Sequence, residues 1–294
     1  MHKPPMSDPA PQRLIFQPAL RAARRDRAAA GFAGYDFLYR YMLDELMERL
    51  DIVQRPLGEV LVIGCPDTRA RAMLESLGKS VVCLDPGFIN ASANHGVQAD
   101  EDALPFADNS FDLIIACGTL DSVNDLPGAL VLMRRILRPD GLLLAAFCGG
   151  GTLPQLRAAL LSGEDDRAGA HIHPQIDLRT MGDLLQRAGF AMPVVDSDMV
   201  TARYGSILSL MHDLRGMGST NCLTSASPLN RVSIAKAAIA FAEQAEPDGK
   251  TAEQFNLFYL SGWKPDPSQP APAKRGSATV SLAAALAPKD KPAS

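Results

Sequence analysis

Four short stretches of the sequence place polar, ligand-type residues directly after apolar, strand-like runs. Gly64 ends the run "EVLVI", and Asp85 follows "SVVCL" at a spacing of roughly 20 residues, which suits a carboxylate that accepts hydrogen bonds from ribose hydroxyls. "ADEDALPF" places Asp100 where a carboxylate could accept from an exocyclic amine, and "ACGTLDSV" follows the next run. One acid after a strand is typically a solvated turn residue. Four stretches in order, each beyond the end of a strand, predict a ligand site at one edge of a sheet.

The segments between these stretches alternate between apolar runs and amphipathic patterns. Strands are predicted at 59–63, 80–84, 112–116 and 142–147, and helices at 68–77, 125–137, 152–161 and 177–188. Strands that alternate with helices predict an α/β fold, a mostly parallel sheet with helices on both faces.

The chain divides into a main domain and flanking segments of different composition. The predicted divisions are a disordered N-terminus at 1–13, a helical cap at 14–55, a main domain at 56–264 with a helical insert at about 200–250, and a disordered tail at 265–294. Within the cap, residues 18–50 form one predicted helical stretch. "EQFNLFYLSGW" predicts the last strand of the main domain.

Composition narrows the classes of partner. A net charge of −4 gives no global attraction to nucleic acid or to an anionic membrane. The sequence has no apolar run long enough for a transmembrane helix, and its N-terminus lacks the apolar core of a signal peptide. We expect a cytoplasmic protein with no integral membrane segment.

Cysteine and histidine do not suggest a metal centre. The five cysteines lack CxxC spacing, and four of them lie in or beside predicted strands, as reduced, buried thiols do. His171 and His173, in "HIHP", are two residues apart, but no further ligands cluster in the nearby sequence. We therefore predict reduced structural cysteines, polar loop histidines and no metal.

Longer motifs resemble a known superfamily. "ADEDALPFADNSFDLIIACGTLDSVNDLPGALVLMRRILRPDGLLLAAF" is similar to the middle of class I S-adenosylmethionine-dependent methyltransferases. "DLRGMGSTN" and the closing "GW" resemble one subgroup, which contains the malonyl-carrier-protein methyltransferase of biotin synthesis and the respiratory complex I assembly methyltransferase-like protein, an arginine hydroxylase. "FQPALRAARRDRAA" resembles the N-terminal signature of the second, in its alphaproteobacterial form. The resemblance covers about residues 13–264 and implies a Rossmann-like, seven-stranded sheet whose last strand is antiparallel.

The resemblance implies an S-adenosylmethionine site. It places Gly64 beside the methionine part of the cofactor, Asp85 on the ribose hydroxyls, Asp100, Glu101 and Leu104 around adenine, and Cys117 and Gly118 along the pocket after the fourth strand. Cys65, which follows Gly64, is a further predicted cofactor-binding residue. It indicates no catalytic residue. A dehydrogenase-type dinucleotide domain fits less well, because a pyrophosphate needs a Gly-rich turn at a helix N-terminus.

The chain departs from this family at two places. The turn normally reads Gly-x-Gly-x-Gly, whereas here Pro66 fixes φ and removes an amide donor, and Asp67 adds a carboxylate. Asp121 and Ser122 replace a His-Trp pair that is frequent in the subgroup. We expect the altered turn to narrow the methionine end of the pocket and to leave the adenosine end usable, so that cofactor binding is retained, weakened or lost.

Two functions therefore stay open. The first is an S-adenosylmethionine-dependent methyltransferase, a transferase acting on a protein or a carrier-bound acyl group. The second is an assembly factor for respiratory complex I, non-catalytic or hydroxylating, with a complex I subunit as its partner. The sequence has no 2-His-1-carboxylate spacing of a self-contained iron oxygenase, so hydroxylation rests on the resemblance alone.

Two further regions are candidates for partner recognition. The stretch "RYGSILSLMHDLRGMGSTN" presents apolar residues that pack in a core or select a substrate, at Tyr204, Leu208, Met211, Leu214 and Met217. Arg203, Arg215 and Asn221 in the same region could face an anionic or peptide substrate. A second cluster, at Arg21, Arg24, Arg25 and Arg27, is predicted to be a solvated face or a guide for an acidic partner.

Overall fold

A computed structural model describes residues 14–163, 170–226 and 228–269. The predicted disordered N-terminus and all but residues 265–269 of the predicted tail lie outside this part of the chain.

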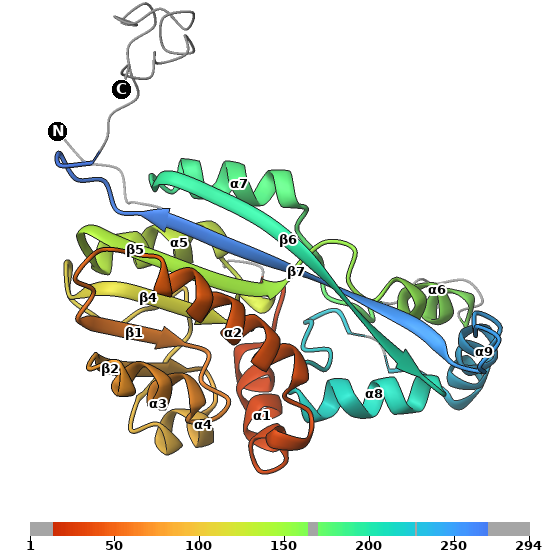
Figure 1. The fold of residues 1–294 in the computed structure, drawn as a ribbon. Coiled ribbons are helices and arrows are strands. Elements are labelled where there is room, and N and C mark those ends of the chain that lie inside the picture. The colour runs from red at the N-terminus through yellow and green to blue at the C-terminus, as the bar shows by residue number, and fades with distance from the viewer. Residues whose placement is uncertain (1–13, 164–169, 227, 270–294) are drawn as a thin grey trace, which may run out of the picture.

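The described chain is built around one seven-stranded sheet with strand order β3-β2-β1-β4-β5-β7-β6 (Figure 1). The strands are β1 (Glu59–Ile63), β2 (Ser80–Asp85), β3 (Val97–Gln98), β4 (Phe111–Cys117), β5 (Leu137–Cys148), β6 (Ala191–Tyr204) and β7 (Thr251–Trp263). Neighbouring strands are parallel except at β7, which pairs antiparallel with both β5 and β6. The chain order reverses between β1 and β4, so a switch point lies at their carboxyl ends. This is the class I methyltransferase fold, as predicted.

Helices cover both faces of the sheet. They are α1 (Pro18–Ala29), α2 (Phe37–Asp51), α3 (Arg69–Ser76), α4 (Phe88–Ala93), α5 (Leu126–Ile136), α6 (Pro154–Ser162), α7 (Leu178–Arg187), α8 (Ile207–Gly216) and α9 (Arg231–Ala242). The predicted helical stretch 18–50 is two helices, because the chain breaks at Gly31 and makes a short 3-10 turn, Phe32–Gly34, before α2 starts.

The core follows from the alternation of side chains along the strands. Val60 and Val62 of β1 point to one face, where α2 and α3 pack, and Leu61 and Ile63 point to the other, where α5 and α7 pack. Both sets are fully buried, as expected of a central parallel strand, whose sequence reads as a continuous apolar run.

The ladder of β6 and β7 extends past the end of β5. Pairing of β5 with β7 ends at Cys148–Leu257, whereas β6 and β7 stay paired to Tyr204–Thr251. Helices α6, α8 and α9 gather around this overhang in Figure 1, and α9 contacts both of the others. The overhang and its helices form a wall beside the carboxyl ends of the parallel strands.

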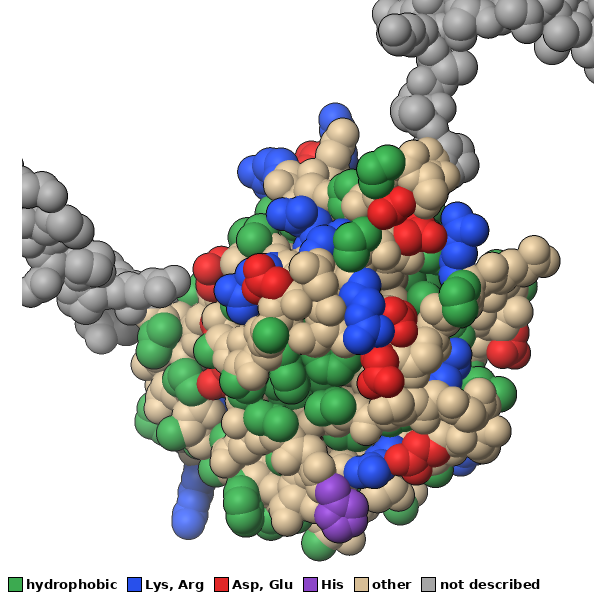
Figure 2. All heavy atoms as spheres, turned by 90° about the vertical axis from the view of Figure 1, so that its left-hand side faces the viewer, with side chains coloured by type: hydrophobic (Ala, Val, Ile, Leu, Met, Phe, Trp, Pro, Cys, Tyr) green, Lys and Arg blue, Asp and Glu red, His purple; other side chains and the backbone are tan. Residues whose placement is uncertain are grey.

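The opposite face, at the amino end of β1, carries interspersed charges. Figure 2 shows Lys and Arg side chains beside Asp and Glu side chains on this face, and no field of one sign. Surface ion pairs such as Arg138–Asp112 belong to this end of the sheet.

Candidate functional site

The turn after β1 keeps the backbone geometry of a ligand-binding turn despite its altered sequence. Gly64 has φ +81°, and a Cβ at this position would lie 2.4 Å from the Cys117 carbonyl oxygen, so only glycine fits. The Cys65 amide donates to Asp85 Oδ2 at 2.9 Å, while its side chain is buried in the core. Cysteine at this position therefore keeps the contact between its amide and Asp85, and its side chain fills space in the core.

Asp67 belongs to the start of α3. Its Oδ1 accepts from the Arg69 amide at 3.0 Å, and its Oδ2 lies 3.5 Å from Arg69 Nη2. Arg69 in turn pairs with Asp36 at 2.7 Å. The carboxylate that the sequence adds to the turn is thus held by the first turn of the helix that follows.

Asp85, the predicted ribose ligand, has no accessible surface. Arg25 of α1 donates to both of its oxygens, from Nε at 2.9 Å and from Nη2 at 2.6 Å. The amides of Cys65 and Gly87 also donate to it, at 2.9 and 2.8 Å. Burial opposes ionisation of Asp85, but Arg25 and the amides outweigh it and hold the pKa of this carboxyl below its ordinary value.

Glu101, predicted to lie near adenine, is also fully buried and is bound by Arg21 of α1. Arg21 Nη1 and Nη2 donate to its two oxygens at 2.6 and 2.8 Å. The Thr119 hydroxyl donates to the same carboxylate. Arg21 Nη1 also reaches Asp100 at 3.3 Å, and its Nε donates to the Ser122 hydroxyl at 3.0 Å. Ser122, one of the two residues that depart from the subgroup, is therefore a partner of this arginine.

The other predicted cofactor residues line the same edge. Leu104 is buried in the apolar core below it. Cys117 is fully buried, and burial raises the pKa of its thiol. Gly118 has φ +65° and, with Arg21 and Arg25, lines a cavity of about 20 Å³. That volume holds about one water molecule.

These observations test whether S-adenosylmethionine fits. A ribose needs acceptors for its hydroxyls, but Arg25 already donates to both carboxylate oxygens of Asp85. The guanidinium of Arg21 binds both carboxylate oxygens of Glu101, the residue predicted to lie near adenine. The residues present do not fit the nucleoside while α1 is in place. The structure thus obstructs the adenosine end, the opposite end from the one suggested by the altered turn.

The arginine cluster also differs from the sequence expectation. Arg21 and Arg25 are not solvated, because both guanidiniums are inserted between α1 and the sheet and paired with carboxylates. Arg24 and Arg27 instead bond the Thr220 hydroxyl, at 2.7 and 3.1 Å. Arg21 and Arg25 are four residues apart and therefore share one face of the helix, which is the pattern that the sequence offers for this pair.

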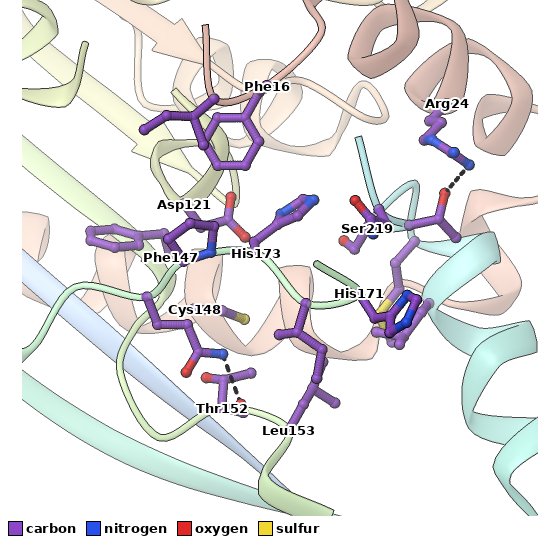
Figure 3. A pocket seen from close by; sticks show the side chains of 18 of the residues that line it. Phe16, Arg24, Asp121, Phe147, Cys148, Thr152, Leu153, His171, His173 and Ser219 are labelled. Atoms are coloured by element: carbon purple, nitrogen blue, oxygen red, sulfur yellow. Dashed lines mark hydrogen bonds between the residues drawn. The ribbon is translucent and has the colours of Figure 1, made fainter. Parts of the chain in front are cut away.

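A large pocket opens next to the closed site (Figure 3). It has a volume of about 960 Å³ and a predominantly apolar wall, contributed by the chain after β4 and β5, by α6, by residues 171–176 and by the end of α8. Its apolar lining includes Phe16, Leu38, Leu120, Val123, Phe147, Leu156, Leu160, Ile172, Ile176, Met211, Met217, Leu229 and Phe255. The size and lining suit a small-molecule or side-chain ligand.

A few polar groups reach the pocket. Asp121, the second departure from the subgroup, lines it, and Phe16, Asp121 and His173 gather at one end in Figure 3. The rings of Phe16 and His173 lie 4.9 Å apart, and burial lowers the pKa of His173. His173 Nε2 also accepts from the Cys222 amide at 3.2 Å. No group of potential metal ligands occurs among the described residues.

The predicted insert contributes only part of this wall. Met211, Leu214, Met217, Arg215 and Asn221 line the pocket. Tyr204 and Leu208 do not, since the first is buried in the core and the second is exposed. Arg203 forms surface ion pairs with Glu246 and Asp248. Residues 171–176 also line this pocket, and no sequence pattern predicted their contribution.

Comparisons with known proteins agree with this architecture. The family described as a methyltransferase domain matches residues 61–145. Arginine-hydroxylase NDUFAF5, mitochondrial, of Danio rerio is 36% identical over 287 residues, which is 92% of this chain and 88% of that protein. Malonyl-[acyl-carrier protein] O-methyltransferase of Methylovorus sp. is 30% identical over 259 residues, 82% of this chain and 86% of that protein.

Solved structures bear on the fold alone. The YcgJ protein of Bacillus subtilis has a TM-score of 0.54 and 15% identity, over 77% of this chain and 99% of that one. None of the helices within the described ranges combines the length and the apolar character that a membrane span requires. From its strand order and its relatives, the chain belongs to the class I S-adenosylmethionine methyltransferase family, in the group that includes NDUFAF5 arginine hydroxylases and malonyl-[acyl-carrier protein] O-methyltransferases.

Proposed function

We propose that this protein is an assembly factor for respiratory complex I that receives an apolar segment of a complex I subunit in its large pocket. The observation that carries the proposal is the contrast at the carboxyl edge: about 960 Å³ of apolar pocket is open, while the acids that would bind adenosine are paired with arginines. The arginine hydroxylases of Danio rerio and Homo sapiens are enzymes, and each is 36% identical to this chain. The proposal that the partner is a complex I subunit rests on this relationship.

The pocket supports a protein partner through its mixed lining. Apolar side chains contributed by several separate segments suit an aliphatic or aromatic anchor residue, and Asp121, Arg24 and Asn221 add polar groups to the lining. An apolar anchor in a well-packed pocket is the usual source of affinity in protein recognition.

Site-specific photo-cross-linking tests this function. A benzophenone side chain introduced at Met211, inside the pocket, is expected to cross-link a complex I subunit in cells that are assembling the complex. The matched control places the same group at Val232 of α9, which is exposed and does not line the pocket. Equal yields of that subunit from both positions, or an acyl carrier protein captured at Met211 instead, would contradict the proposal.

S-adenosylmethionine-dependent methyl transfer is the second candidate, and one observation favours it. Gly64 retains φ +81° and the Cys65 amide still reaches Asp85, as a cofactor-binding turn requires. This candidate needs α1 to leave its observed position before the nucleoside can enter. Calorimetric titration of the intact protein with S-adenosylmethionine separates the two candidates.

A further inference from the structure

Helix α1 presents two arginines to the edge of the sheet at a spacing of one helical turn. Arg21 and Arg25 lie on the same face, and each meets a carboxylate that follows a different strand. Arg21 is only 6% exposed, and Asp85 and Glu101 are fully buried. The two ion pairs are therefore inside the molecule.

Both pairs have the two-pronged geometry that a planar guanidinium offers a carboxylate. Arg25 supplies two donors to the two oxygens of Asp85, as two neighbouring ribose hydroxyls would. Arg21 supplies two donors to Glu101 and further bonds to the Thr119 carbonyl and hydroxyl oxygens, at 2.9 and 2.8 Å. The arginines thus satisfy groups that a nucleoside would otherwise satisfy.

Further contacts fix α1 in this position. Before the helix, the Gln17 amide donates to the Cys222 carbonyl at 2.8 Å, and Phe16 forms a β-bridge with Leu223. Within it, Asp26 accepts from the Ile89 amide at 2.8 Å. A Cβ on Gly87 would lie 2.8 Å from the Asp26 carboxylate, so the helix packs directly on the loop after β2.

The two buried carboxylates depend on a partner that donates hydrogen bonds to them. Asp85 and Glu101 are taken out of water, and a buried carboxylate without a partner is strongly disfavoured. If α1 left, both acids would need either solvent or another donor-rich ligand. A nucleoside supplies hydroxyl and amine donors, and free guanidinium supplies the planar cation itself.

We propose that Arg21 and Arg25 form an internal ligand that occupies the nucleoside subsite and excludes adenosine-bearing molecules from it. The subsite behind the arginines remains competent, because Gly64 keeps its backbone conformation and the Cys65 and Gly87 amides still orient Asp85. This inference concerns the cofactor edge alone and does not depend on which partner enters the large pocket.

The test compares adenosine binding to three forms of the full chain. Wild type and the double variant Arg24→Ala/Arg27→Ala are expected to show no adenosine-dependent rise in melting temperature at millimolar ligand. The second form is the matched control, because it removes the same charge from the same helix but leaves the carboxylate pairs intact. Arg21→Ala/Arg25→Ala is expected to bind adenosine at least tenfold more tightly than wild type.

Chemical rescue gives a second readout for the same variant. Millimolar guanidinium chloride is expected to raise the melting temperature of Arg21→Ala/Arg25→Ala and not that of the control, because only the first has carboxylates left unpaired. If the double variant does not fold, adenosine binding and guanidinium rescue are both measured on the single variant Arg25→Ala, in which only Asp85 loses its arginine. Adenosine binding to wild type as tight as to the variant would overturn the proposal, and so would a folded variant that neither adenosine nor guanidinium stabilises.

Discussion

Two regions at the carboxyl edge of the sheet share a wall but differ in what fills them. The nucleoside subsite, between α1 and the ends of β2 and β4, is polar, carries two buried carboxylates and is filled by arginines of the same chain. The large pocket beside it is apolar and open. Arg21 and Arg25 face the first region, and Arg24 of the same helix lines the second.

The proposed exclusion of adenosine rests on helix α1 and leaves Asp85 and Glu101 in place. Gly64, Asp85 and Glu101 are all present, and the backbone at Gly64 is in the expected conformation. Access is decided by α1, outside the matched methyltransferase domain of residues 61–145. Acids that are present in the sequence at the expected strand ends therefore do not establish an open site.

The largest effect is expected from breaking the pair at Glu101. Arg21→Ala leaves a fully buried carboxylate without its cation, and we expect the free energy of unfolding to fall by about 3–5 kcal/mol. Urea denaturation measures it. Arg27→Ala, an exposed arginine of the same helix, serves as the control and should change stability by less than about 0.5 kcal/mol. Equal losses of unfolding free energy in the two variants would show that the buried ion pair stabilises the fold no more than the exposed arginine does.

The next effect concerns pH. The pKa of Asp85 is lower in the folded protein than its ordinary value, so its contribution to stability is complete above about pH 4 and is lost as pH falls through the folded pKa. In Arg25→Ala, the hydrogen bonds from the Cys65 and Gly87 amides and from Asn90 Nδ2 remain to oppose the effect of burial. We expect the folded pKa to rise above the unfolded one, so that protonation stabilises the variant as pH falls.

Urea denaturation between pH 7 and pH 3 measures this contrast. The difference in unfolding free energy between wild type and Arg25→Ala should shrink toward acid pH, with a slope of up to about 1.4 kcal/mol per pH unit. A difference that stays constant over this range would mean that Asp85 does not titrate as the ion pair predicts.

A smaller effect is expected when the large pocket is changed. Ile172→Asp places a charge in the apolar lining, next to residues that approach from α6. Partner binding should weaken about tenfold, which corresponds to about 1.4 kcal/mol. Surface plasmon resonance against the subunit identified by cross-linking measures it. Ile239→Asp, at an exposed position of α9 outside the pocket, is the control and should leave the affinity unchanged.

The smallest effect is expected at the altered turn. In Pro66→Gly/Asp67→Thr, the helix α3 loses the Asp67 contact to the Arg69 amide, and unfolding free energy should fall by about 1 kcal/mol. S-adenosylmethionine binding should not appear, because the arginines still close the adenosine end. Calorimetry on this variant checks the point, and tight binding after the double substitution would place the obstruction at the turn instead.

The sequence predicted the central sheet well because its strands are buried on both faces. The predicted strand 59–63 coincides with β1, where four consecutive apolar residues are fully buried. The strand β6 was not predicted in detail, because it is an edge strand that pairs only with β7 and has a run of three polar residues, 196–198, in its middle. Its length and overhang depend on that partner.

The cofactor site stays a prediction, and the pairing of its acids could not be inferred from local patterns. Asp85, Asp100 and Glu101 lie together at the predicted edge. Their partners, Arg21 and Arg25, are 60 or more residues away in sequence. A basic run on a helix reads as a solvated face unless the structure shows what lies against it.

Calorimetric titration of S-adenosylmethionine into the intact wild-type protein tests the central claim most directly. The ion pairs of Arg21 and Arg25 predict no detectable binding heat at ligand concentrations below the millimolar range. The same titration into Arg21→Ala/Arg25→Ala should reveal binding. Micromolar binding to the wild-type protein that Asp85→Asn weakens would contradict the account, because it would mean that the ribose and not Arg25 is the ordinary partner of this carboxylate.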